Sequence, residues 1–213
     1  MPAKPRRGER LLEDALRALC NGLDETGAPW MIIGGIAGIA RGIARFTTDI
    51  DAAVRGDAVT VRGLVEHLGR HRISPRIDDA ITFAEENLVL LLRHEPTGVD
   101  LDVSFAWSGF EHEALDARTV VSFGRVRAPM VTPDDLLVFK AIAGRPKDAQ
   151  DAEALLALYP ALDLARARRR VRELAALAEA PELATQFETW LRRRPARPHR
   201  RPAAAKPRAR RKP

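Results

Sequence analysis

Cysteine is almost absent from this sequence, which contains only Cys20. A single thiol can form neither an internal disulfide nor a zinc site built from several cysteines, and such a composition is typical of a reducing compartment. Aromatic residues are also scarce, at 5% of the chain, so the core must consist mainly of Leu, Ile, Val and Ala. These absences exclude the class of small secreted domains that disulfides stabilise.

Long apolar runs are missing as well. The longest, Trp30 to Ala40, is interrupted by glycines and is far shorter than the ~20 residues that a membrane helix needs. The N-terminal sequence MPAKPRRGER is basic but no apolar segment follows it, so we do not expect a secretory signal. We therefore expect a cytoplasmic protein with no membrane partner.

Acidic residues are absent from Arg192 to Pro213, a segment with eleven Lys or Arg and five Pro. Removing these eleven charges from the formal net charge of +6 leaves −5 for residues 1–191. A segment so basic, without large apolar side chains, cannot bury enough surface to fold. We expect a disordered basic tail over 192–213, which either contacts nucleic-acid phosphates or only keeps the protein soluble.

The hydrophobic pattern predicts an α/β core followed by helices. Apolar spacing predicts helices over 9–23, 36–44 and 59–68, and strands over 30–33, 50–54, 87–93 and 99–105. One or two short strands are expected within 72–83, and a hairpin within 119–131 around Gly124. The strand over 87–93 is hydrophobic on both faces, which indicates an inner position in the sheet.

After Val131 the pattern becomes helical. Thr132 followed by Pro133 and, at the third position, Asp135 is a favourable helix start, and helices are predicted over 133–143, 147–159, 163–178 and 181–191. We therefore predict an α/β core with a mixed central sheet over 1–131, a helical C-terminal domain over 132–191 and the tail over 192–213.

Acidic residues two positions apart occur on two of the predicted strands. Side chains with this spacing share one face of a strand, so Asp49 and Asp51 point the same way, as do Asp100 and Asp102. If the two strands are neighbours, three or four carboxylates converge. The alternation by itself does not decide between Asp100 and Asp102 as the third acid.

Converging carboxylates need a cation between them, and Mg²⁺ prefers oxygen ligands of this kind. Two such ions about 3.5–4 Å apart can hold the attacking and leaving oxygens of a phosphoryl transfer, while one carboxylate accepts the proton of the incoming hydroxyl. The turn Gly34-Gly35 lets the backbone approach a phosphate, and the helix that follows offers its amides. The pattern matches neither the Walker sequence nor the dinucleotide-binding fingerprint.

A second charged motif follows the predicted helix over 133–143. Lys140, Arg145 and Lys147 can reach phosphate oxygens, and Asp148 can orient one of these cations or bind a base or ribose. The alternative is purely structural. Gly144 would end one helix, Pro146 would begin the next, and Asp148 would be an ordinary acid of its first turn.

The region from Trp30 to about Leu158 resembles the nucleotidyltransferase fold of the DNA polymerase beta superfamily. In particular it resembles the AbiEii-type toxins of abortive-infection type IV toxin–antitoxin systems. Those proteins carry a Gly-Gly or Gly-Ser turn, then Asp-x-Asp, then a third acid on a later strand before a Phe-Glu pair. Phe110-Glu111 occupies that place and favours Asp102. The string R-x-K-D-x-x-D is matched by Arg145, Lys147, Asp148 and Asp151.

The resemblance implies a Mg²⁺-dependent nucleotidyltransferase with Asp49, Asp51 and Asp102 as catalytic metal ligands. The residues implied in binding a nucleoside triphosphate are Gly34, Gly35, Thr48, Lys140, Arg145, Lys147 and Asp148. The acceptor would be RNA, such as a transfer-RNA end, and the partner a cognate antitoxin. Two alternatives stay open. They are a non-catalytic nucleic-acid-binding protein that uses the tail, and an enzyme that modifies a small antibiotic.

Overall fold

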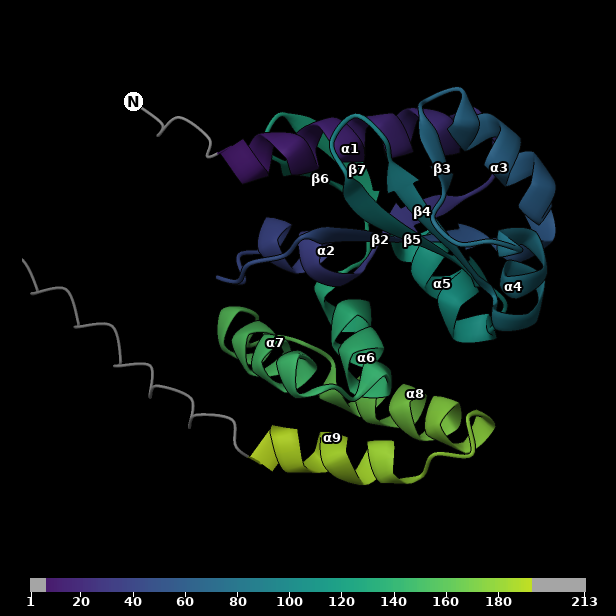
Figure 1. Ribbon diagram of the computed structural model, residues 1–213. Coiled ribbons are helices and arrows are strands. Elements are labelled where there is room, and N and C mark those ends of the chain that lie inside the picture. Colours follow the sequence, from purple (N-terminus) through teal and green to yellow (C-terminus); the bar gives the residue numbers. More distant parts are fainter. Residues whose placement is uncertain (1–6, 193–213) are drawn as a thin grey trace, which may run out of the picture.

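A mixed sheet of seven strands forms the centre of the computed structural model, which describes residues 7–192 (Figure 1). The predicted tail therefore lies, apart from Arg192, outside the described residues. The strand order is β3-β4-β5-β2-β1-β7-β6. The strands are β1 (Trp30–Ile32), β2 (Asp49–Arg55), β3 (Ile73–Pro75), β4 (Val89–His94), β5 (Val99–Ala106), β6 (Thr119–Phe123) and β7 (Val126–Met130). Only the β2–β5 and β1–β7 pairs are parallel.

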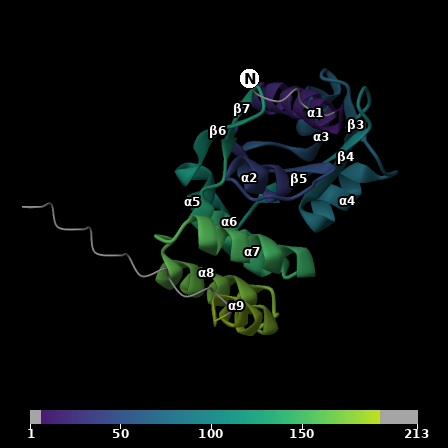
Figure 2. The ribbon, with the colours of Figure 1, turned by 90° about the vertical axis from the view of Figure 1, so that its left-hand side faces the viewer.

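Helices cover both faces of this sheet. α1 (Arg7–Asp24) and α3 (Val61–Gly69) pack together on one face, whereas α2 (Gly34–Ala40), α4 (Ala80–Asn87) and α5 (Gly109–Ala117) lie on the other (Figures 1 and 2). The buried side chains of β2 and β5 join those of α1 in one apolar core. Because strand side chains alternate, the intervening residues of β2 and β5, which include all four aspartates, face away from α1.

Four further helices follow the last strand and lie beneath α2 and α5 in Figure 1. They are α6 (Pro133–Ala143), α7 (Pro146–Leu158), α8 (Leu164–Leu177) and α9 (Glu182–Arg192). The predicted start of α6 is confirmed, because the hydroxyl of Thr132 accepts a hydrogen bond from the Asp135 amide and Pro133 occupies the first turn. The helix ends at Gly144, whose φ of 65° is left-handed. That residues 132–191 fold as a separate domain stays a prediction.

Two segments differ from the sequence-based expectation. Residues 72–83 contain one short strand, β3, which agrees with the one or two expected, but residues 80–87 form α4, a helix that was not predicted. Its sequence AITFAEEN contains Ala and Glu, which favour helix. The helix expected over 36–44 is α2, which begins at Gly34 and ends at Ala40. Gly42 then adopts a φ of 98°, which cannot continue a helix.

Deleting a buried side chain of α1 will test the packing of this helix on the sheet. Leu16 is fully buried, so we expect Leu16→Ala to lower the free energy of unfolding by about 2.7–5 kcal/mol in urea denaturation. Leu177→Ala, at a residue that is 64% exposed, is the matched control and should cost much less. Equal losses for the two variants would contradict the packing described.

Candidate active site

Parallel pairing of β2 with β5 brings the four aspartates together. In the register of these strands Asp49 stands opposite Asp100, and Asp51 stands opposite Asp102. Paired residues of adjacent strands point to the same face of a sheet, so all four carboxylates lie on the face opposite α1. The adjacency on which the sequence analysis depended is therefore present.

The four carboxylates have different partners. Asp100 accepts a hydrogen bond from Arg93 Nε at 2.8 Å, and Asp102 accepts one from Arg76 Nη1 at 2.6 Å. Asp49 accepts instead from the Thr47 hydroxyl at 2.6 Å, and Asp51 from the Gly35 amide at 3.4 Å. Within residues 7–192, neither Asp49 nor Asp51 forms an ion pair, so this pair retains negative charge that a cation can neutralise.

The electrostatics of the site agree with that geometry. Burial raises the pKa of Asp51, and the neighbouring charges of Asp49 and Asp102 raise it further, against the hydrogen bond from Gly35. Burial by itself would raise the pKa of Asp49 as well. However, the hydrogen bond from the Thr47 hydroxyl and the charges of Lys147 and Arg45 hold that pKa below the ordinary value. Asp51 is therefore the carboxylate that the protein alone compensates least.

The Gly34-Gly35 turn lies directly against these acids. Gly34 has a φ of 62°, and a Cβ atom there would overlap the carboxylate of Asp51. A Cβ on Gly35 would lie 2.5 Å from the Thr47 hydroxyl and 3.5 Å from Arg45 Nη2. Both glycines are thus required by close approach, and the turn, the acids and Arg45 form one site.

A buried cluster of charges joins the C-terminal helices to this site. The Lys140 ammonium is 3.0 Å from Asp148 Oδ1 and 2.8 Å from Asp151 Oδ2, and all three side chains are buried. Arg145 Nε lies 2.6 Å from Asp148, and Arg45 pairs with Asp151. Lys140 is therefore enclosed by the two acids, so a direct contact of Lys140 with a triphosphate stays a prediction.

Arg145 and Lys147, like Lys140, interact electrostatically with the carboxylate pair. The hydrogen bond to Asp148 raises the pKa of Arg145 despite burial, and the charges of Asp51 and Asp49 contribute. Lys147 in turn lowers the pKa of Asp49. Asp148 combines both interpretations of the motif, because it is an acid of the first turn of α7 and also orients Lys140 and Arg145. Those bonds hold its pKa below the ordinary value despite burial.

The sequence analysis missed three residues that contact the site, namely Thr47, Arg45 and Arg76. Thr48, which the resemblance implied, is exposed, and its role in binding a nucleotide stays a prediction, whereas Thr47 is buried and donates to Asp49. The even spacing between Thr47 and Asp49 could have indicated this. Arg45, in the same segment, carried no separate signal. Arg76 is 26 residues from Asp102 in the chain, so only the folded arrangement reveals it.

The donor set suits a hard cation such as Mg²⁺. Asp49 and Asp51 supply carboxylate oxygens side by side. The pKa of Asp51 is raised by burial and by the charges of Asp49 and Asp102, and a bound cation would neutralise that charge. Within residues 7–192, however, no three His, Cys, Asp or Glu side chains are gathered closely enough to form a ready metal site. Asp102 would complete the set through the oxygen that Arg76 does not hold.

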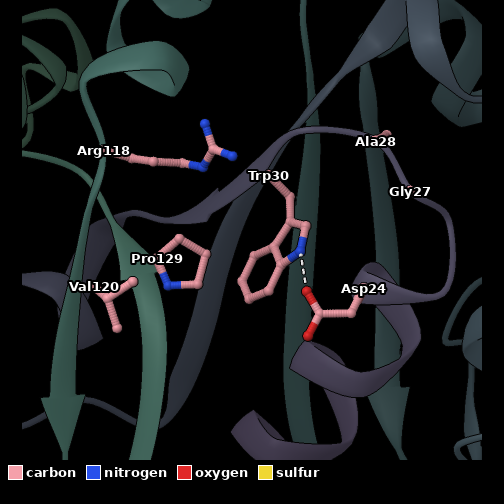
Figure 3. Close-up of a pocket in the computed structure, with 7 residues that line it drawn as sticks. All are labelled: Asp24, Gly27, Ala28, Trp30, Arg118, Val120 and Pro129. Atoms are coloured by element: carbon pink, nitrogen blue, oxygen red, sulfur yellow. Dashed lines mark hydrogen bonds between the residues drawn. The ribbon is translucent and has the colours of Figure 1, made fainter.

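Two pockets of the structure differ in their relation to the acids: one is lined by a residue of the strand that carries Asp102, and the other is not. A cavity of about 330 Å³ is lined by Ile33, Ser104, Phe110 and Phe139 among others, and Ser104 follows Asp102 on the same face of β5. Another pocket, of about 530 Å³, lies beside Trp30, whose indole donates to Asp24 at 2.9 Å (Figure 3). Its described lining includes none of the predicted site residues.

Comparison with known proteins defines the fold. No family model matches the chain, and no curated protein matches it. The solution structure of the antibiotic-resistance factor ANT(2'')-Ia is similar at 19% identity, with a TM-score of 0.52 over 82% of this chain and 94% of that chain. An antigenic nucleotidyltransferase-like protein from Paracoccidioides brasiliensis matches at 16% identity, with a TM-score of 0.50 over 87% and 95%.

The chain therefore has the nucleotidyltransferase fold, and the predicted α/β class is confirmed. Neither of these proteins is described as an AbiEii-type toxin, so that finer resemblance stays a prediction. Within residues 7–192, no helix has the length and apolar character needed to span a membrane.

Amide substitution should affect stability oppositely at the two neighbouring acids. Because the pKa of Asp51 is raised in the folded state, the folded protein loses stability as pH rises through the window between the ordinary and the raised value. Asp51→Asn should therefore unfold at higher urea concentration than wild type at pH 7 without divalent cations. Asp49→Asn should unfold at lower concentration, because its pKa is lowered. Shifts of the same sign would contradict the assignment.

The buried charge cluster should be strongly coupled. Asp148→Ala removes a partner from buried Lys140, and we expect a cost of about 3–5 kcal/mol in free energy of unfolding. Glu173→Ala removes an exposed partner of Arg170 and should cost at most about 1 kcal/mol. Urea denaturation of both variants measures the difference. A cost for Asp148→Ala as small as that of the control would show that the cluster is solvated.

Proposed function

We propose that this protein is a Mg²⁺-dependent nucleotidyltransferase, which moves a nucleotide from a nucleoside triphosphate to an acceptor hydroxyl. The observation that carries the proposal is the meeting of Asp49, Asp51 and Asp102 beside the Gly34-Gly35 turn. The nucleotidyltransferase fold adds support. Function resides in the site rather than the fold, so the acids carry more weight than the likeness.

Each part of the site has a role in this reaction. Asp49, Asp51 and Asp102 would hold the metal. When bound, two Mg²⁺ ions would stabilise charge on the attacking and leaving oxygens. Arg145 and Lys147, which already act on the carboxylate pair, would contact the triphosphate together with the glycine turn. The acceptor oxygen bonds to the α-phosphorus, the bond from that phosphorus to the bridging oxygen breaks, and pyrophosphate leaves. One carboxylate takes the hydroxyl proton.

RNA is the acceptor class that we propose first. The cavity that Ser104 lines, two residues after Asp102 on β5, is also lined by Trp107, Phe110 and Phe139, and Trp107 is 59% exposed. An exposed aromatic side chain such as Trp107 can stack on an unpaired base, as at a transfer-RNA end. A role as the toxin of a toxin–antitoxin pair extends this proposal, with growth arrest on expression and rescue by a cognate antitoxin as its signs.

A small cationic antibiotic is the second candidate acceptor. Residues 1–191 carry a formal charge of −5, which would attract a polyamine-like drug. Resistance on expression, rather than growth arrest, would favour this candidate.

Label transfer tests the reaction. The purified full chain is incubated with α-labelled nucleoside triphosphates, Mg²⁺ and either total RNA or an aminoglycoside mixture. We expect transfer by wild type, and a loss of about 100-fold or more for Asp49→Ala, Asp51→Ala and Asp102→Ala. Asp100→Ala, on the same face but paired with Arg93, is the matched control and should keep its activity.

Two outcomes would reject the enzyme. One is no transfer from any triphosphate, with nucleic-acid binding that is lost when residues 192–213 are deleted, which would favour a non-catalytic binding protein. The other is equal transfer by wild type and Asp49→Ala, which would show that the observed activity is a contaminant.

A further inference from the structure

Arg76 lies in line with the proposed metal ligands across the sheet. At the edge of the sheet, Pro75 of β3 pairs with Leu92 of β4. The amide of the next residue, Arg76, donates to the Leu91 carbonyl at 3.1 Å. Leu91 pairs with Asp102 on β5, which pairs with Asp51 on β2. One transverse row of the sheet therefore runs from Arg76 to the carboxylate pair.

The guanidinium of Arg76 is held by the sheet as well as by Asp102. Its Nη1 atom donates to Asp102 Oδ1 at 2.6 Å, to the Leu92 carbonyl at 3.1 Å and to the Leu101 carbonyl at 3.3 Å. Two of these three acceptors are backbone atoms of β4 and β5, which cannot move independently of the sheet. The position of the charge therefore does not depend on the carboxylate alone.

The neighbouring pair of Arg93 with Asp100 shows what an ordinary ion pair looks like on the same strands. Arg93 Nε contacts Asp100 at 2.8 Å, and the Arg93 side chain is 50% exposed, compared with 22% for Arg76. No hydrogen bond within the described residues joins the Arg93 guanidinium to a strand carbonyl. An exposed pair of this kind contributes little.

We propose that Arg76 is a positioning residue for the metal site, an inference that rests on the proposed function. Arg76 binds one oxygen of Asp102, Oδ1, and so orients the carboxylate with Oδ2 available as a cation ligand. An arginine attached only through Asp102 would compete with the incoming cation. The bonds to the Leu92 and Leu101 carbonyls keep Arg76 in place when the cation shares the carboxylate.

This arrangement also explains how the site distinguishes between the two acids of β5. Asp102 is oriented by a half-buried, sheet-anchored cation and acts on Asp51, whereas Asp100 pairs with Arg93, whose side chain is more exposed. Hydrogen bonds to a metal-ligating carboxylate commonly affect metal affinity by about 10–100-fold. We expect an effect of that size from Arg76 and none from Arg93.

Direct metal binding tests the proposal without requiring turnover. Mn²⁺ is titrated calorimetrically into the full chain for wild type, Arg76→Met and Arg93→Met, after circular dichroism has established that each variant is folded. We expect Arg76→Met to bind Mn²⁺ about 10–100-fold more weakly than wild type, and Arg93→Met to bind it within about twofold. Arg76→Lys, which restores a charge but not the planar fork, should fall between wild type and Arg76→Met, and decides the matter if Arg76→Met does not fold.

A double-mutant cycle shows whether Arg76 acts through Asp102. In an Asp102→Asn background, Arg76→Met should weaken Mn²⁺ binding no further. An equal loss in both backgrounds would overturn the proposal, as would unchanged or tighter binding by Arg76→Met, which would make Arg76 a spectator or a competitor. If wild type itself binds no Mn²⁺, the proposed function fails and this inference fails with it. If wild type binds Mn²⁺ and Arg76→Met binds it with the same affinity, the proposed function stands and only this inference is overturned.

Discussion

The parallel pairing of β2 with β5 is the constraint on which the rest of the site depends. It places Asp49 and Asp51 opposite Asp100 and Asp102, on strands whose other faces are sealed in the apolar core. Four like charges in so small an area repel one another. The surrounding structure can therefore be understood as the set of contacts that makes this concentration of charge tolerable.

The negative charges of the four aspartates are compensated unequally. The acids of β5 are each paired with an arginine, while Asp49 receives a hydroxyl donor and the more distant charges of Arg45 and Lys147. Asp51 accepts a hydrogen bond from a backbone amide, has no ion pair within residues 7–192, and interacts electrostatically with Lys140 and Arg145. The C-terminal helices participate through the cluster of Lys140, Asp148 and Asp151, which also binds Arg45 beside the glycine turn. Packing of these helices and electrostatics of the site are thus coupled.

Local rules predicted most of the secondary structure. The Thr132 cap, Pro133 and Gly144 delimit α6 as expected, because capping depends on a few adjacent residues. The same rules did not predict α4, a short helix flanked by Asp79 and Leu88, which both have left-handed backbone conformations. They also did not indicate that Thr47 would bind Asp49, because the face of a side chain before β2 follows from the path of the chain and not from residue type.

The sequence by itself determined that Asp49 and Asp51 share a face, that glycines precede them, and that a second acidic strand exists, since strand periodicity is a local property. Only the tertiary structure decided which strands are adjacent, which arginine meets which acid, and that Lys140 is enclosed by Asp148 and Asp151. The physical reason is that charge pairing depends on distances between segments far apart in the chain. Those distances follow from packing the whole sheet and its helices.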